Sequence, residues 1–160
     1  MSSYHAISAT PETMVWGYLA ATARPVIEVK SGDTVSLACM PAGGPASLPA
    51  DRSMVPAAYL AAIEMLPQGP GAHFVTGPVF VSGAERGDTL QVEILSVEPT
   101  MESGFTATMP LLGTLPEEFL ECEIVHPRID RARGICTLPW GTELPLDPFF
   151  GVLGTAPPPE

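Results

Sequence analysis

The stretch HFVTGPVFVSGAERGDTLQVEILSVE, residues 73–98, decides the fold class. Its opening segment, HFVTGPVFV, is rich in valine and phenylalanine, which favours a β-strand that begins after a glycine-rich loop. From residue 89 the apolar side chains of Leu90, Val92 and Ile94 alternate with polar neighbours, which is the period of a half-buried strand. We therefore expect strands on both sides of a turn that contains glycine and aspartate.

The sequence pattern of this turn also occurs upstream in the chain. SGDTVSL at residues 31–37 and RGDTLQV at residues 86–92 share the order Gly-Asp-Thr followed by apolar and polar residues. Glycine takes the backbone angles that a tight turn requires, and aspartate accepts hydrogen bonds from turn amides. A pattern that occurs twice indicates structure rather than an active site, so we predict that Asp33 and Asp88 hold turns.

Further strands are expected on either side of this region. The segments 25–29 and 34–39 flank Lys30–Asp33, and SSYHAISA near the N-terminus has the composition of a short strand. ECEIVHPRID and GICTLPWGTELPL predict two strands around a turn at residues 130–134. Frequent glycine and proline, 15 and 19 residues, suit a domain with many turns.

One helix is expected, at about residues 56–66, where alanine is frequent and Leu60, Ile63 and Leu66 recur near helical spacing. Residues 41–54 have the composition of a loop. Together these patterns predict one mainly β domain over residues 1–160, a β-sandwich or jelly-roll-like fold with one short helix.

Charge and composition exclude several classes of function. A formal net charge of −11 disfavours nucleic acid and anionic membranes as partners. No apolar run is long enough to span a bilayer, and no secretory signal opens the chain, so we expect a cytoplasmic protein. The three cysteines, Cys39, Cys122 and Cys136, lie in apolar runs and are predicted to be buried free thiols.

The histidines are the candidates for chemistry. His5, His73 and His126 show no short metal-ligand spacing, and no phosphate loop, nucleotide fingerprint or serine-hydrolase motif is present. His126 precedes a proline in a polar segment, which is typical of a surface residue. His73 opens a strand after a glycine-rich loop, a place where a loop gives access and a sheet gives rigidity.

Several segments in order resemble the acetamidase/formamidase family: TPETMVWGY, SGDTVSL, GPGAHFVTGPVFVSGAERGDTLQVEIL, GTLPEEF and PLDPFFGVLGTAP. The central block is similar to the family's His-x-x-Thr-Gly-Pro-x-x-Val-x-Gly-Ala-Glu-x-Gly-Asp signature. The resemblance covers essentially the whole chain but only the N-terminal half of the family, whose members are about twice as long. Two local departures are Val15 before Trp16-Gly17, where many members carry histidine, and the segment SGFTATMPLLG.

The resemblance implies hydrolysis of a small linear amide to carboxylate and ammonia, with water activated by a divalent metal, zinc being the first choice. It makes His73 and Glu85 the candidate catalytic residues and His73 and His5 the candidate metal ligands. Trp16 and Phe149–Phe150 are expected in the core or in a subunit interface.

The partners that the resemblance implies are a second chain carrying the missing C-terminal half and a homo- or hetero-oligomer. Two other functions are alternatives to amide hydrolysis. The first is a regulatory or structural β-sandwich subunit that has lost the chemistry, and the second, less favoured, is a small-molecule-binding β-domain.

Overall fold

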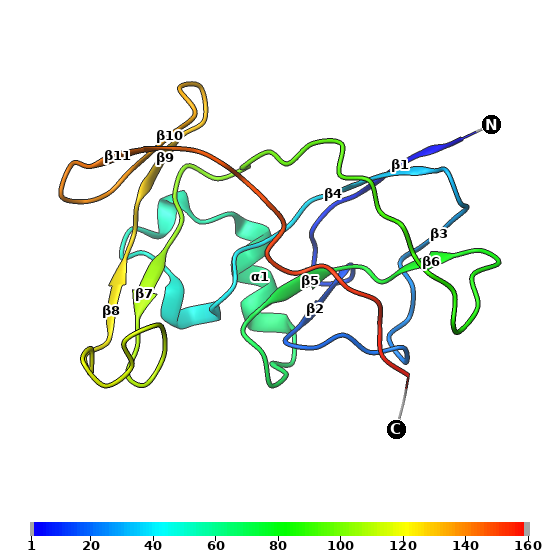
Figure 1. The fold of residues 1–160 in the computed structure, drawn as a ribbon, viewed down its shortest axis with the longest axis horizontal. Coiled ribbons are helices and arrows are strands. Elements are labelled where there is room, and N and C mark those ends of the chain that lie inside the picture. The colour runs from blue at the N-terminus through cyan, green and yellow to red at the C-terminus, as the bar shows by residue number, and fades with distance from the viewer. Residues whose placement is uncertain (1, 159–160) are drawn as a thin grey trace. The chain divides into compact units, whose positions relative to one another are not determined.

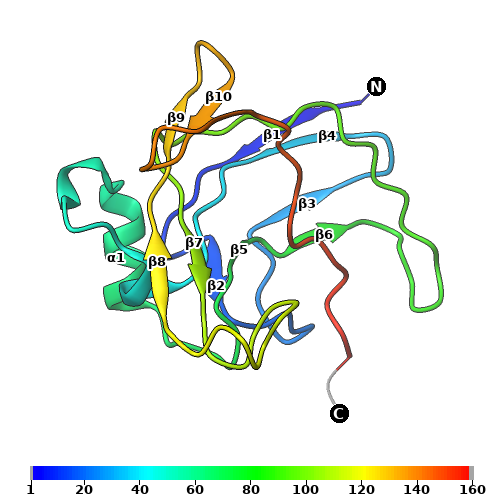
Figure 2. The same ribbon diagram turned by 60° about the vertical axis from the view of Figure 1, so that its left-hand side comes forward.

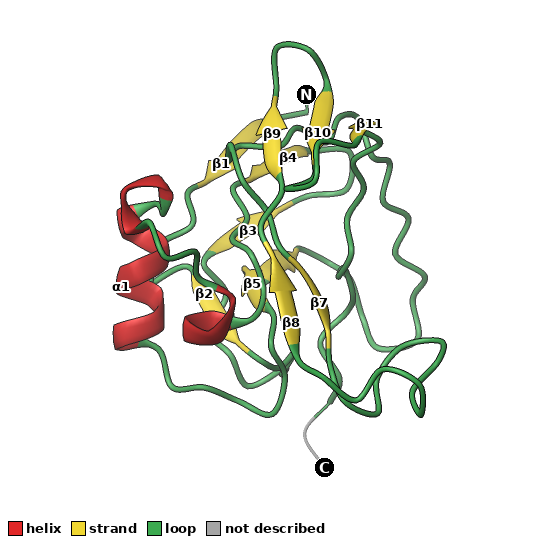
Figure 3. Ribbon diagram, turned by 90° about the vertical axis from the view of Figure 1, so that its left-hand side faces the viewer, coloured by secondary structure: helices red, strands yellow, loops and turns green. Residues whose placement is uncertain are grey.

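The protein is mainly β-structure with one α-helix, which confirms the predicted fold class; the computed structural model describes residues 2–158 (Figures 1 and 3). It divides into two compact units. Unit 1 consists of residues 1–48, 55–94 and 151–160, and unit 2 consists of residues 49–54 and 95–150.

Unit 1 holds three pairs of short strands, and Figure 2 shows the members of each pair side by side. Two pairs are parallel and one is antiparallel. The parallel pairs are β1 (Tyr4–Ile7) with β4 (Thr34–Leu37) and β3 (Ile27–Val29) with β6 (Val79–Val81), and the antiparallel pair is β2 (Met14–Trp16) with β5 (Phe74–Thr76). The strands predicted around Lys30–Asp33 and within HFVTGPVFV are therefore confirmed.

The helix α1 (Ala57–Met65) supplies one side of the core of unit 1. Its buried residues Tyr59 and Ala62 lie three positions apart and therefore share one face of the helix. The ring of Phe74 stacks on that of Trp16 at a centroid distance of 4.5 Å and meets the ring of Tyr59 edge-on at 5.3 Å. The predicted core position of Trp16 is confirmed. Before the helix, the expected loop contains two 3₁₀ turns, Gly44–Ser47 and Arg52–Met54.

Three glycines allow the backbone to cross itself closely at the end of β2. Gly69 donates its N–H to the carbonyl of Trp16 at 2.9 Å, and Gly71 donates to the carbonyl of Gly17 at 3.0 Å. A Cβ added at Gly17 would lie 2.6 Å from the carbonyl oxygen of Gly71, and one added at Gly69 would lie 2.8 Å from that of Trp16. No side chain larger than hydrogen fits between these segments.

Unit 2 is built from antiparallel strands. β7 (Thr106–Thr108) pairs with β8 (Glu123–Val125), and a three-stranded sheet has the order β11 (Glu143–Pro145), β10 (Ile135–Thr137), β9 (Arg128–Asp130). β9 and β10 form the hairpin predicted around residues 130–134, and Asp130 Oδ1 accepts the N–H of Arg133 at 2.9 Å in its turn.

The strand predicted at residues 89–98 is wrong. The segment carries no strand and has no β-partner within residues 2–158, and the side chains of Leu90, Val92 and Ile94 are exposed. Apolar and polar residues do alternate along the segment, but a strand also requires a neighbour to satisfy its backbone groups. Residues 89–98 lack that neighbour in the described chain.

The predicted burial of the cysteines is also wrong, although all three are free thiols. Cys39 and Cys122 are exposed and Cys136 is half-buried. Cys39 lies beyond the end of β4 and Cys122 precedes β8, so neither is on a strand face that packs against a core. No helix within residues 2–158 combines the length and apolar character needed to cross a membrane.

The close crossing predicts that alanine costs more stability at Gly17 than at Gly83, although both glycines have positive φ. Gly17 (φ +89°) is crowded by backbone, whereas Gly83 (φ +79°) has nothing within 4 Å of an added Cβ. Gly83→Ala should cost only about 1–2 kcal/mol for the left-handed backbone. Gly17→Ala should cost roughly 3 kcal/mol or more, because the overlap adds to that strain. Urea denaturation of both variants measures this, and equal losses would contradict the close crossing.

Candidate functional site

The backbone around His73 is fixed from two sides. Gly17 donates its N–H to the carbonyl of His73 at 2.8 Å, and Gly43 donates to the carbonyl of Ala72 at 2.8 Å. The next residue, Phe74, begins β5 and is buried in the core beside Trp16. His73 therefore sits at the mouth of a strand on a backbone that packing and hydrogen bonds hold in place.

The imidazole of His73 is free to meet a ligand. The ring of His5 pairs with Asp33, and Nδ1 of His126 lies 3.3 Å from the carbonyl oxygen of Gly104. Within residues 2–158 the His73 ring makes no such contact, and the residue is exposed. The His73 ring is therefore accessible to a ligand, but only the backbone that carries it is held in place. His126 is half-buried rather than on the open surface that the sequence predicts.

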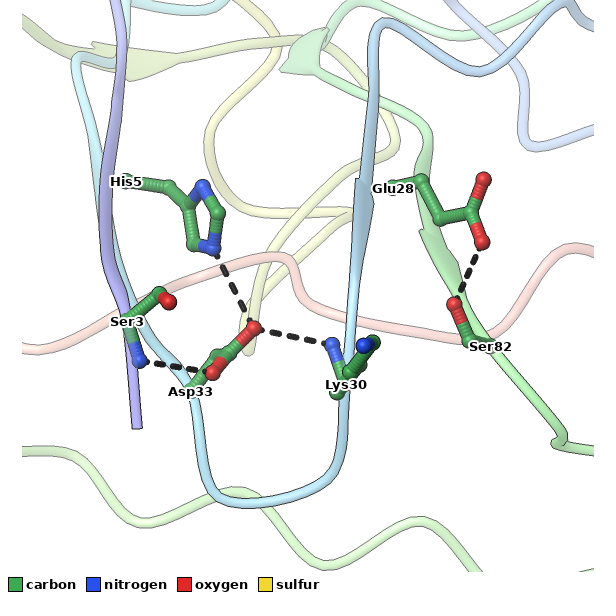
Figure 4. Close-up of polar contacts among 6 residues, drawn as sticks. All are labelled: Ser3, His5, Glu28, Lys30, Asp33 and Ser82. Carbon is green, nitrogen blue, oxygen red and sulfur yellow. Dashed lines mark hydrogen bonds and ion pairs between the residues drawn. The ribbon is translucent and has the colours of Figure 1, made fainter. Parts of the chain in front are cut away.

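His5 lies on β1, and its partner is a residue that the sequence assigned only to a turn. His5 Nε2 is 3.2 Å from Asp33 Oδ2. The same carboxylate accepts the backbone N–H of Lys30 at 2.9 Å and that of Ser3 at 2.8 Å, so three groups converge on it (Figure 4). Asp33 therefore closes its own turn, as predicted, and also fastens β1 to that turn.

These contacts set the charge of Asp33. The N–H groups of Lys30 and Ser3, with a smaller contribution from His5, lower the pKa of Asp33 from 3.8 to about 2. The carboxylate is thus ionised throughout the physiological range. Because its oxygens accept hydrogen bonds from two backbone amides, the Asp33 carboxylate has a structural role. It also holds the His5 ring beside it.

Glu85 lies in the second turn, where its backbone matters more than its side chain. Its N–H donates to Asp88 Oδ2 at 2.9 Å, which repeats the Lys30–Asp33 contact, and the predicted role of Asp88 in holding a turn is confirmed. The residue Glu85 is exposed. The carboxylate has the surroundings of a solvated surface group.

A metal site requires several ligands close together, and the described chain does not provide them. Within residues 2–158, no three His, Cys, Asp or Glu residues are grouped closely enough to hold a metal ion. His73, His5 and Glu85 consequently do not form a metal centre by themselves. Structural zinc takes four ligands and catalytic zinc commonly takes three from protein, so this donor set does not fit the expected metal.

Trp16 carries a feature that sequence reasoning missed. Its Nε1 is buried and has no hydrogen-bond partner within the described residues. A buried N–H without an acceptor is costly unless water or another molecule accepts its proton. Only the packing of β2 against β5 and α1 makes this donor unusual, so no local sequence pattern could have found it.

Unit 2 has a hollow of its own beside the β9–β10 hairpin, with a volume of about 530 Å³. Arg128, Arg131 and Arg133 line it together with Glu102 and Asp130. Arg133 is already paired with Glu143 through two contacts of 3.0 Å. The basic and acidic groups balance, and none of the predicted site residues lines the hollow.

Comparison with known proteins identifies the family. The model of the "Acetamidase/Formamidase family" matches residues 22–160, which is most of the chain. The chain belongs to the acetamidase/formamidase family. No curated protein matches it. The resemblance found in the sequence is thereby confirmed, and membership supports amide hydrolysis of the acetamidase/formamidase type in general.

The contacts of Asp33 with Lys30, Ser3 and His5, called here the Asp33 clamp, predict how the stability of this family member depends on pH. Since the folded pKa of about 2 lies below the ordinary 3.8, ionised Asp33 stabilises the fold above pH 3.8, and this contribution is lost as the pH falls towards 2. Asp33→Ala should remove it at neutral pH and accelerate amide hydrogen exchange along β1. Asp88→Ala is the control, because within residues 2–158 its carboxylate accepts only the N–H of Glu85. Unchanged exchange along β1 in Asp33→Ala would contradict the clamp.

Proposed function

We propose that the chain hydrolyses a small linear amide to carboxylate and ammonia, and that it does so together with a second chain carrying the other half of the family's fold. The observation that supports this most is the family match over residues 22–160. Within the matched region, His73 is the one histidine whose ring is exposed and free within the described chain.

Amide hydrolysis defines what a site must supply. The carbonyl is a poor electrophile and the nitrogen a poor leaving group, so water must be activated, the developing oxyanion stabilised and the nitrogen protonated. His73 is the proposed proton carrier, because histidine is the side chain that most often transfers protons in general acid–base catalysis. Its fixed backbone would restrict the ring to the positions that its own rotamers reach, and its exposure leaves room for a small amide.

The remaining parts of the reaction require groups from outside this chain. Glu85 and His5 stay candidates, but Glu85 lies in an exposed turn and His5 is held by Asp33. The expected divalent cation, zinc first, remains a prediction for an assembly in which a second chain adds ligands. The described residues do not form a site for that metal by themselves.

Exposed apolar side chains favour a partner in general. In unit 2 the side chains of Leu112, Trp140 and Phe149 are 62%, 65% and 80% exposed. Exposed aromatic and aliphatic groups in such number are typical of protein contact surfaces rather than of a solvated monomer. Phe149 therefore fits the interface role expected from the sequence and not the core role.

The second candidate function is a regulatory or structural subunit that retains the scaffold without chemistry. The observation that favours it is the missing metal-ligand group within residues 2–158. Under this alternative the His73 ring has no catalytic role, and replacing it does not change the activity of any assembly that contains the chain.

Ammonia release from formamide and acetamide distinguishes the two functions. We expect activity when the chain is combined with a partner encoded by a neighbouring reading frame. His73→Ala should lower kcat/KM by about 100-fold or more, as expected for loss of general acid–base catalysis. His126→Ala is the matched control, because that ring lies against the carbonyl of Gly104 and should leave activity unchanged.

Metal analysis of the same preparations separates the explanations of a negative result. Bound metal in the assembly but not in the lone chain supports shared ligands. An assembly that holds neither metal nor amidase activity, or full activity in His73→Ala, would overturn the proposal and leave the subunit role.

A further inference from the structure

The face of the β2–β5 pair that carries His73 is otherwise apolar. In the register of the two strands, Val15 lies opposite Val75 and Trp16 lies opposite Phe74, and Figure 2 shows the strands side by side. The rings of Trp16 and Phe74 stack in the core. Because successive side chains of a strand point to opposite faces, Val15 and Val75 lie on the other face of the pair, and so does His73, two positions before Val75.

Both valines are close enough to the His73 ring to share a ligand with it. Diagonal neighbours across an antiparallel pair lie roughly 7–8 Å apart, a distance that aromatic and long side chains still span. Val15 is the diagonal neighbour of His73, and Val75 follows His73 on the same face of β5. Both valines are half-buried, so part of each isopropyl group reaches the surface.

No other polar side chain on this face is free. The position opposite His73 is Gly17, which donates its N–H to the His73 carbonyl at 2.8 Å and has no side chain. Just before β2, the hydroxyl of Thr13 bonds to the carbonyls of Ser8 and Thr10. Among residues 13–17 and 73–77 there is no carboxylate, ammonium or guanidinium group. The face therefore offers one imidazole beside two aliphatic groups.

We propose that Val15 and Val75 bind the acyl group of the amide and select amides with a short aliphatic acyl group over formamide, whose carbonyl carbon carries only hydrogen. This role of the valines rests on the proposed amide hydrolysis, because it takes the amide as the ligand at His73. An uncharged aliphatic amide matches the face, since its polar end meets the imidazole and its carbon chain covers apolar surface. The valines determine specificity and supply no reacting group.

The size of the selection follows from the apolar area that the acyl group removes from water. Full burial of one CH₂ group strengthens binding by about fourfold, and contact with one half-open face gives less. We therefore expect binding to strengthen by about two- to fourfold with each added carbon, from formamide to acetamide to propionamide.

Titration of the lone chain, followed by nuclear magnetic resonance, tests this contact without any need for catalysis. With propionamide, the methyl signals of Val15 and Val75 and the ring signals of His73 should shift along one binding curve. Formamide at the same concentration should shift the valine signals much less. Val92, which is 49% exposed and lies outside this strand pair, is the internal control for unspecific contact. Unshifted Val15 and Val75 signals, or an equal shift at Val92, would overturn the inference.

Threonine substitutions test the valines themselves, because threonine keeps the branched shape of valine and replaces one methyl group by a hydroxyl. Val15→Thr should weaken propionamide binding by about two- to fourfold and leave formamide binding unchanged. Val75→Thr is a second variant on the same face. Val79→Thr is the matched control, since Val79 is also a half-buried valine of a strand pair but lies on β6 beside β3.

Circular dichroism verifies that these variants fold. The control should bind propionamide as the unchanged chain does. If Val15→Thr and Val75→Thr both leave propionamide binding unchanged, or if Val79→Thr weakens it equally, the valines do not form the acyl site.

The ammonia assay separates this inference from the proposed function. In an active assembly, Val15→Thr should lower the ratio of kcat/KM for propionamide to that for formamide by about two- to fourfold. An unchanged ratio overturns the acyl site and leaves amide hydrolysis standing. An assembly that releases no ammonia removes the proposed function, and the titration of the lone chain then decides by itself whether this face binds an aliphatic amide.

Discussion

The close crossing of the backbone at Gly17, Gly69 and Gly71 is the constraint on which the core of unit 1 depends. It brings the end of β2 against the loop before β5 and thereby sets the Trp16–Phe74 stack on which α1 packs. The same contact gives His73 its fixed backbone, because Gly17 donates to the His73 carbonyl. Core packing and the backbone position of His73 therefore have one origin, and a side chain added at the crossing would disturb both.

The two glycine–aspartate turns have the same local hydrogen bonds, but their aspartates differ in the further contacts they make. Both close in the same way, with an aspartate carboxylate accepting the first amide of the turn. Asp33 acquires further partners in Ser3 and His5 because β1 lies alongside β4, and its carboxylate then fastens the N-terminal strand. Asp88 acquires no such partners within residues 2–158, and the chain beyond it remains uncovered. The difference lies in the neighbours and not in the turn.

The sequence could predict what local chemistry determines. The β9–β10 hairpin, the helix over Ala57–Met65 and the turn roles of Asp33 and Asp88 all rest on residues close together in the chain. It could not predict that His5 meets Asp33, because these residues are 28 positions apart and meet only through parallel pairing of β1 with β4. It could not predict the close crossing either, because Gly17 lies far from Gly69 and Gly71 in the sequence.

The error at residues 89–98 has a different cause, because periodicity reports which face of a segment is apolar but not whether anything covers that face. The exposed apolar side chains of Leu90, Val92 and Ile94 and the exposed ring of His73 are nonetheless separate features of the chain. The only metal-ligating side chain between residues 89 and 94 is that of Glu93, so this segment offers no set of ligands for a metal at His73. Covering the apolar side chains would therefore not complete the chemistry proposed for His73, which depends on groups that the described residues do not provide.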